Sequence, residues 1–152
     1  MPKQEDMPRF KHPIPATDVI IEYNDGLTDG IVLITRKYPP YGVALPGGLA
    51  EYGISLEENA AKEAWEETGL EVIIENPQKP LCVHSDPDRD PRAHLFTVVY
   101  VGKGYGHLQA GDDAKTATLF TIDEVKDLLG TGQIAFDHEE IIEKYMEFRG
   151  YT

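Results

Sequence analysis

Cysteine is almost absent from this chain: Cys82 is the only one, so no disulfide bond can form within it. A chain without disulfides suits a reducing compartment, and we expect a cytoplasmic protein in which Cys82 is a small apolar strand residue. The N-terminal stretch MPKQEDMPRFKHP lacks the apolar segment of a signal peptide. Aliphatic runs such as Ile31 to Ile34 are too short to cross a bilayer. These absences argue against secretion and against a membrane partner.

Basic residues are also scarce. The chain has 14 Lys and Arg against 27 Asp and Glu, a net charge of −13. Because binding to a nucleic-acid backbone depends on clustered Lys and Arg, we expect no nucleic-acid partner. The acidity is concentrated, with eight Glu and one Lys between Ala50 and Glu75. Such a block is either a solvated helix face or a site for a multivalent cation, and composition does not separate the two.

The length of 152 residues fits one domain, with about residues 1–14 as an N-terminal extension. Apolar runs between turn signals predict seven strands. They are Asp18 to Tyr23, Ile31 to Lys37, Val43 to Leu45, Glu71 to Ile74, Leu81 to His84, His94 to Val101, and Ala117 to Phe120. We expect Pro46-Gly47-Gly48 to interrupt regular structure, and residues Gly102 to Ala114 to form a loop.

Three helices are predicted from capping signals. The clearest begins at Ser55, which forms a capping-box pattern with Glu58, and ends at Gly69. The other two are a helix from Thr121 to Leu129, stopped by Gly130, and a last helix capped by Asp137 with Glu140. Strands mixed with a few helices favour helices packed on the faces of a mixed sheet, an α/β (α+β) fold.

The first helix carries three glutamates on one face. Glu63, Glu66 and Glu67 stand at i, i+3 and i+4, so their directions fall within an arc of about 100°. Like charges at this spacing repel, and no Lys or Arg lies at matching offsets on the arc. A hard divalent cation needs several carboxylate oxygens that converge from a rigid element. Spacing alone leaves a solvated face as an equal alternative, because Glu is a good helix former.

The whole segment GGLAEYGISLEENAAKEAWEETGL, Gly47 to Leu70, resembles the Nudix box, G-x5-E-x7-R-E-U-x-E-E-x-G-U, in which U is a bulky aliphatic residue. The matching positions are Gly48, Glu63, Glu66, Glu67, Gly69 and Leu70. The resemblance implies an α/β/α sandwich around a mixed sheet, and an enzyme that hydrolyses a phosphoanhydride bond. It also implies that Glu63, Glu66, Glu67 and the backbone carbonyl of Gly47 hold magnesium or manganese. A carbonyl ligand at Gly47 suits a residue that allows close backbone approach.

Three positions depart from the box. Ile54 replaces its first Glu, Lys62 replaces its Arg, and Ala64 stands where a bulkier aliphatic residue is usual. In the family, that Glu and Arg commonly support one another, and an Arg left unpaired in a partly buried site would be costly. The two losses therefore compensate each other, and we expect Lys62 to extend its ammonium toward water.

The reaction implied is attack of water on phosphorus, and a carboxylate must accept the proton. Nudix enzymes differ in which carboxylate does so. Glu63 is one candidate, and Asp112 and Asp113 in the predicted loop are the others. An ordinary turn before the next strand explains those two aspartates equally well.

Four further pieces resemble the bacterial and archaeal ADP-ribose pyrophosphatase branch of the family: RKYPPYGVALPGGLAE, HSDPDRDPRAH, GDDAKTATLF and IAFDHEEII. Two positions differ, because that branch often has Trp at Val43 and Phe at Leu49, so a stacking contact with adenine is not implied. Members of this branch are commonly homodimers that share the substrate pocket, and the resemblance therefore implies a homodimer.

Candidate substrate contacts come from the same pieces. Arg89 and Arg92 suit bidentate contacts with phosphate, and His94 lies beside them. The alternative is a Pro- and Asp-rich turn in which the arginines balance local acids. Tyr41 stands at the expected pocket rim, whereas His138 is expected to cap or pack.

The resemblance implies hydrolysis of ADP-ribose to AMP and ribose 5-phosphate. Two alternatives stay open. One is hydrolysis of another nucleoside diphosphate derivative or of a modified nucleoside triphosphate. The other is a non-catalytic ADP-ribose-binding sensor, an alternative that stays open because Ile54 and Lys62 depart from the box.

Overall fold

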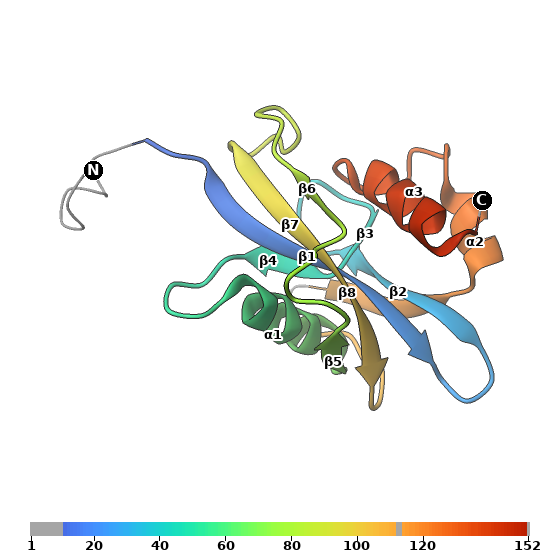
Figure 1. Cartoon of the computed structure of the whole chain (residues 1–152). Coiled ribbons are helices and arrows are strands. Elements are labelled where there is room, and N and C mark those ends of the chain that lie inside the picture. The colour runs from blue at the N-terminus through green and yellow to red at the C-terminus, as the bar shows by residue number, and fades with distance from the viewer. Residues whose placement is uncertain (1–10, 112–113, 152) are drawn as a thin grey trace.

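In residues 11–111 and 114–151, which the computed structural model describes, eight strands form one mixed sheet (Figure 1). The strands are β1 (Ile14–Asn24), β2 (Asp29–Arg36), β3 (Val43–Ala44), β4 (Gly47–Leu49), β5 (Glu71–Ile74), β6 (Cys82–His84), β7 (Leu95–Tyr105) and β8 (Ala114–Phe120). The main order is β3-β2-β1-β7-β5, and β4, β6 and β8 pair with β1, β7 and β2. β1 and β7 are parallel, whereas the other ladders are antiparallel.

Helices cover both faces of this sheet. Helix α1 (Leu56–Thr68) lies on one side, and α2 (Ile122–Leu128) and α3 (His138–Arg149) lie on the other (Figure 1). In β1, Val19 and Ile21 pack in the cluster that contains residues of α1, whereas Ile20 packs in the cluster that contains residues of α3. A strand buried on both faces reads as an unbroken apolar run. The fold is therefore the expected α/β/α sandwich.

Local sequence explains where α1 begins and ends. The hydroxyl of Ser55 accepts a hydrogen bond from the backbone N–H of Glu58 at 3.2 Å. At the other end, Gly69 takes a left-handed conformation with φ 74°, and its N–H bonds the Trp65 carbonyl. Both signals are those that predicted the helix.

Two predictions about β4 and β7 were wrong. Gly47 and Gly48 do not interrupt regular structure but lie in β4, which pairs with Asp18 and Thr17 of β1. β7 runs on through Gly102 and Gly104 to Tyr105, so the loop begins later than predicted. In both strands glycine allows close packing: a Cβ at Gly104 would lie 2.8 Å from an Ile21 methyl. Glycine therefore marked close approach here rather than a turn.

Other boundaries also shift. β1 begins at Ile14, four residues before the predicted strand, because its parallel pairing with β7 starts at Ile14 and Leu95. Asp137 precedes α3 as predicted, but its side chain makes no capping hydrogen bond. Asp112 and Asp113 lie outside the described residues. No helix in the described part of the chain is long and apolar enough to cross a membrane.

Candidate active site

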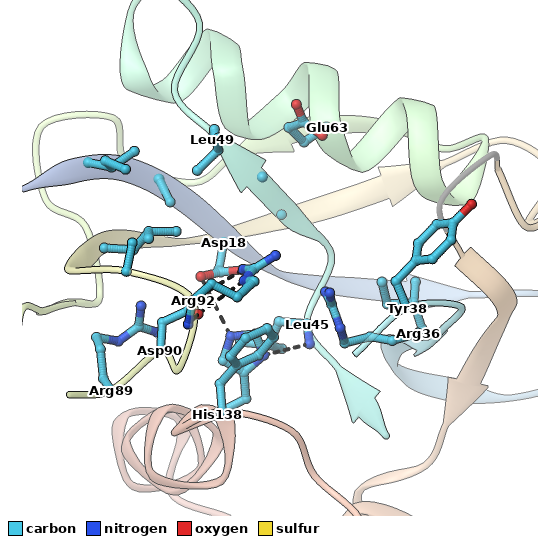
Figure 2. Close-up of a pocket in the computed structure, with 18 of the residues that line it drawn as sticks. Asp18, Arg36, Tyr38, Leu45, Leu49, Glu63, Arg89, Asp90, Arg92 and His138 are labelled. Atoms are coloured by element: carbon cyan, nitrogen blue, oxygen red, sulfur yellow. Dashed lines mark hydrogen bonds and ion pairs between the residues drawn. The ribbon is translucent and has the colours of Figure 1, made fainter. Parts of the chain in front are cut away.

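A cavity of about 570 Å³ opens between the β4–α1 side of the sheet and the start of α3. Residues of β1, β2, β4 and α1 line it, together with the loop of residues 89–93 and residues 136 and 138. Figure 2 shows Glu63 on one side of this pocket and Arg89, Asp90 and Arg92 on the other. The pocket therefore has an acidic side and an arginine-rich side.

The acidic side is built by β4 against α1. A Cβ at Gly48 would lie 2.6 Å from the carboxyl carbon of Glu63, so only glycine leaves room for that carboxylate. The N–H of Gly47 donates to Glu67 Oε2 at 3.3 Å. Gly47, Glu63 and Glu67 all line the pocket. Three of the four predicted metal-binding residues are thus brought together on one wall.

The fourth, Glu66, does not line the pocket. Its Oε1 atom lies 3.1 Å from the ammonium of Lys62, which also contacts Glu51 Oε2 at 2.6 Å. The hydrogen bonds that Lys62 donates to Glu51 and Glu66 raise its pKa. Lys62 is 45% exposed, as expected, but it does not extend freely into water. Glu51 is thus an acidic partner for Lys62, in place of the Glu that the box has at the position of Ile54.

The donor set on this wall fits a divalent metal ion in its chemistry. Carboxylates and a backbone carbonyl are the hard oxygen ligands that magnesium and manganese accept. Within residues 11–111 and 114–151, however, no three His, Cys, Asp or Glu side chains converge closely enough to hold a metal. For Glu66 to join Glu63 and Glu67 around a metal, its carboxylate would have to turn away from Lys62.

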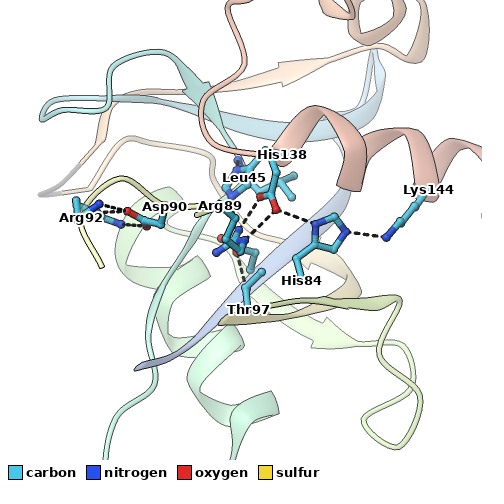
Figure 3. Close-up of polar contacts among 10 residues, drawn as sticks. Leu45, His84, Arg89, Asp90, Arg92, Thr97, His138 and Lys144 are labelled. Carbon is cyan, nitrogen blue, oxygen red and sulfur yellow. Dashed lines mark hydrogen bonds and ion pairs between the residues drawn. The ribbon is translucent and has the colours of Figure 1, made fainter. Parts of the chain in front are cut away.

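On the opposite side, Arg89 is almost fully buried and lies in a polar network (Figure 3). Its Nε and Nη2 atoms donate to the two carboxylate oxygens of Asp137 at 2.9 and 2.7 Å. Burial alone would raise the pKa of Asp137, but hydrogen bonds from Arg89 and His84 lower it to about 2. Because an ionised carboxylate only accepts, His84 carries its proton on Nδ1, and its Nε2 accepts from Lys144 at 2.8 Å.

His138 neither caps α3 nor faces solvent. Its Nδ1 accepts the backbone N–H of Leu45 at 3.0 Å, which places its ring proton on Nε2, 3.7 Å from Asp18 Oδ2. Burial lowers the pKa of His138 although Asp18 opposes this. Thr97 donates its hydroxyl to the same Asp18 oxygen at 2.6 Å. Packing was predicted for His138, and its ring also supports the strand that leads into β4.

Arg92 pairs with a buried acid. Its Nε and Nη2 atoms donate to Asp90 at 3.0 and 2.8 Å, and the Asp90 side chain is only 2% exposed. Burial opposes ionisation, but the hydrogen bonds from Arg92 lower the pKa of Asp90. The arginines therefore balance local acids and also line the pocket, and their contact with a phosphate stays a prediction.

The remaining candidates lie elsewhere. Tyr41 is 70% exposed and is not among the described pocket-lining residues, whereas Tyr38 is. His94 is half-buried, and its ring lies 3.1 Å from the Ser85 carbonyl oxygen. Contact of Tyr41 with a substrate stays a prediction.

The segment after β7 packs against the C-terminal end of α1. Gln109 and Gly111 donate backbone hydrogen bonds to the carbonyls of Thr68 and Glu67 at 2.8 and 2.9 Å. These carbonyls have no partner within a helix, so the segment satisfies them. This packing attaches the predicted loop to the helix that carries the glutamates.

Sequence reasoning missed five residues that line the pocket: Asp18, Arg36, Tyr38, Asp90 and Phe136. Asp18 offered a signal, because a charge at the start of an apolar strand run is rarely buried without a role. Phe136 offered none, since its place depends on how residues 133–138 fold back onto β3.

Comparisons with known proteins agree with this architecture. Residues 12–145 match the family model of the NUDIX domain. The ADP-ribose pyrophosphatase of Methanocaldococcus jannaschii is 41% identical over 97% of this chain and 83% of that protein.

Solved structures give the same fold. A MutT/nudix family protein from Enterococcus faecalis superposes with a TM-score of 0.74 at 31% identity, over 94% of this chain and 64% of that chain. The NUDIX domain of Shewanella oneidensis NrtR, solved in complex with ADP ribose, gives 0.77 at 21% identity, over 98% of this chain and 99% of that one. At that identity the second match supports the fold alone. The chain therefore belongs to the Nudix family of hydrolases, enzymes that act on pyrophosphate bonds.

Proposed function

We propose that this enzyme hydrolyses ADP-ribose to AMP and ribose 5-phosphate with a bound divalent metal, magnesium or alternatively manganese. The observation that carries the proposal is the two-sided pocket, in which Glu63 and Glu67 lie across from Arg89 and Arg92. A diphosphate needs both a cation-binding wall and arginines in reach. The pyrophosphatase from Methanocaldococcus jannaschii supports the choice of substrate, because the similarity covers 97% of this chain.

Glu63, Glu66, Glu67 and the Gly47 carbonyl are the proposed metal ligands. A bound divalent ion there would neutralise phosphoryl charge and lower the pKa of a water molecule. Gly48 leaves room for the Glu63 carboxylate, and the Gly47 N–H bonds Glu67, so the β4 backbone and these two carboxylates share one wall. This also explains how a chain of net charge −13 accepts an anionic substrate.

The proton of the attacking water needs a carboxylate acceptor. Glu63 lines the pocket and is one proposed base. Asp112 and Asp113 are the alternatives from the sequence, and they lie outside the described residues. On the arginine side, Asp137 and Asp90 hold Arg89 and Arg92 in fixed orientations, so little side-chain freedom is lost when phosphate binds.

A second candidate function is binding of ADP-ribose without turnover. The observation in its favour is the ion pair between Lys62 and Glu66, which keeps one carboxylate out of the pocket. Both candidates use the same pocket, so turnover is what separates them. Other nucleoside diphosphate derivatives and modified nucleoside triphosphates belong to the same test.

The decisive experiment incubates the protein with ADP-ribose and a nucleotide panel, in magnesium or in EDTA, and identifies the products. We expect magnesium-dependent AMP release that Glu67→Gln reduces at least about a hundredfold, because a ligand that touches the metal is lost. Glu58→Gln, an exposed glutamate of the same helix, is the matched control and should keep full activity. Tight binding without products would favour the sensor. If the protein shows no binding and releases no products, both functions are excluded.

We further propose that the chain acts as a single domain in the cytoplasm and as a homodimer, with no nucleic-acid or membrane partner. The single cysteine supports the cytoplasmic location, and the net charge of −13 argues against a nucleic-acid partner. Sedimentation velocity tests the dimer, and a monomer at micromolar concentration would contradict it.

A further inference from the structure

Phe136 has a backbone conformation that side chains of its size rarely adopt. Its φ is 57°, in the left-handed region, and it is the only non-glycine residue with positive φ in the described part of the chain. For a bulky residue this conformation is unfavourable, and it persists only where the surrounding structure enforces it. Its side chain lines the pocket. The strain is therefore located at the site rather than in a surface turn.

Three backbone hydrogen bonds enforce this conformation. On one side, Val43 N–H donates to Gln133 at 2.9 Å and Ala135 N–H donates to Val43 at 2.8 Å, which attaches the segment to β3. On the other side, His138 N–H donates to the Ala135 carbonyl at 3.2 Å as α3 begins. The chain must turn between these two attachments, and the turn directs the Phe136 ring into the pocket wall.

Two arginines from distant parts of the chain lie over this one ring. The guanidinium carbon of Arg36 is 4.9 Å from the ring centroid, and that of Arg92 is 5.3 Å from it. Both distances lie within the range of favourable cation–π contacts. Figure 2 draws Arg36 and Arg92 in the pocket, and both residues line the cavity. Phe136 thus unites two positive groups from β2 and the 89–93 loop.

Each guanidinium is also oriented by a second contact. Arg36 Nε donates to the Pro40 carbonyl at 2.7 Å, and Arg92 donates to buried Asp90. A guanidinium is planar and carries five N–H donors. A contact that fixes one edge of the group therefore also fixes the directions of the remaining N–H donors. Two such groups around one ring in the pocket offer planar sets of donors for the oxygens of a phosphate or diphosphate.

We propose that Arg36, Phe136 and Arg92 form an anion subsite for the diphosphate of a nucleoside diphosphate derivative, on the wall opposite Glu63 and Glu67. In this subsite Arg36 and Arg92 contact the phosphate oxygens, and Phe136 is a positioning residue that holds both guanidiniums. The identity of the ligand rests on the proposed function. The subsite itself requires only that a diphosphate binds in the pocket, with or without metal.

Calorimetric titrations in EDTA test this subsite without turnover. The probes are ADP-ribose, inorganic pyrophosphate and adenosine. We expect Arg36→Gln to weaken binding of ADP-ribose and pyrophosphate about tenfold, because a charged hydrogen bond is lost. Phe136→Leu should weaken both about fivefold, since the contacts with two guanidiniums disappear. Adenosine binding should stay within about twofold of the wild type, because it carries no phosphate.

Two comparisons separate positioning from general damage. Phe136→Tyr keeps the aromatic face and should bind the anions as the wild type does. The double variant Phe136→Leu with Arg36→Gln should lose less affinity for the anions than the sum of the two single losses, because Phe136 acts partly through Arg36. Lys126→Gln, on exposed α2, removes the same charge outside the pocket and is the control.

The outcomes also separate this subsite from the proposed function. Unchanged pyrophosphate binding in Arg36→Gln would overturn the subsite even if the wild type releases AMP from ADP-ribose. Arginine-dependent binding without AMP release would support the subsite and contradict the proposed hydrolysis. A wild type that binds neither anion overturns the subsite. If Phe136→Leu does not fold, the Arg36→Gln result decides alone.

Discussion

Asp137 directs its carboxylate away from the helix that it precedes. An aspartate at this position commonly accepts hydrogen bonds from the first turn, yet here both oxygens accept from Arg89, and one also accepts from His84. Arg89 is 5% exposed, and a buried guanidinium without a counter-charge is costly. The Asp137 carboxylate therefore neutralises buried Arg89 instead of capping α3.

This pairing predicts a pH dependence of stability. The pKa of Asp137 in the folded chain is about 2, below its ordinary value of 3.8. The charged form is thus favoured by folding, so its contribution is complete above pH 3.8 and is lost as the pH falls toward 2. The shift corresponds to about 2 kcal/mol.

Urea unfolding from pH 7 down to pH 3 measures this contribution. We expect Asp137→Asn to lower the free energy of unfolding by about 3 kcal/mol at pH 7, with a smaller difference from the wild type at pH 3. Asp88→Asn, an exposed aspartate of the neighbouring loop, is the control and should change little. A difference that stays constant over this pH range would contradict the explanation.

Lys62 gives a second prediction at the scale of one residue. Its ammonium binds Glu66, a proposed metal ligand, and so competes with a cation there. We expect Lys62→Gln to lower the magnesium concentration for half-maximal activity by about threefold, because one competing positive charge is removed. Lys79→Gln, on the exposed surface outside the active pocket, should leave that concentration unchanged. A requirement for more magnesium would show that Lys62 instead helps to position the carboxylates.

At the scale of elements, β4 and α1 act as one unit. The backbone of β4 pairs with β1 and also lies against the carboxylate of Glu63. Gly47 and Gly48 differ in what surrounds them. A Cβ at Gly47 would meet the Thr17 carbonyl and the Asp18 side chain, whereas one at Gly48 would meet only the Glu63 carboxyl group among its nearest atoms.

Alanine substitutions at these two glycines should therefore have different effects. Gly47→Ala must displace backbone, and we expect it to lower stability by about 2 kcal/mol. Gly48→Ala displaces only the end of a flexible side chain, so we expect a stability change within about 1 kcal/mol and an activity loss of at least about tenfold. Thermal unfolding and AMP release measure the two effects. Equal losses of stability in both variants would contradict this distinction.

Elements with strong local signals could be predicted, and those without them could not. Ser55 and Gly69 define α1 through contacts within a few residues, so its ends were clear from sequence. β4 is held by pairing with β1, about 30 residues away, and its glycines resembled a turn. The glutamates on α1 were found because a helix has a regular period. Phe136 was not found because its position depends on the attachment of residues 133–135 to β3, about 90 residues away.

At the scale of the whole molecule, the pocket combines segments that are far apart in sequence. Arg36, Glu63, Arg92 and Phe136 come from four parts of the chain and line one cavity. A ligand that binds this folded arrangement and not the unfolded chain must raise stability.

Binding of metal and nucleotide should therefore raise the melting temperature together. AMP with magnesium, each at about 100 times its dissociation constant, should stabilise the fold by about 2.7 kcal/mol per site. EDTA should remove the part of the melting-temperature shift that is due to magnesium. Compared with the wild type, Glu67→Gln should show a smaller shift in magnesium and an equal shift in EDTA. An equal shift in EDTA would mean that these carboxylates do not hold a metal that supports nucleotide binding.

The sequence by itself determined the family and the acidic helix, because each depends on short-range periodicity or on a fixed spacing along the chain. Tertiary structure decided which residues face one another. It paired Lys62 with Glu51 and Glu66, paired Asp137 with Arg89 and brought Arg36 and Arg92 to the Phe136 ring. Such pairings depend on strand register and helix packing over long separations, which local patterns do not encode.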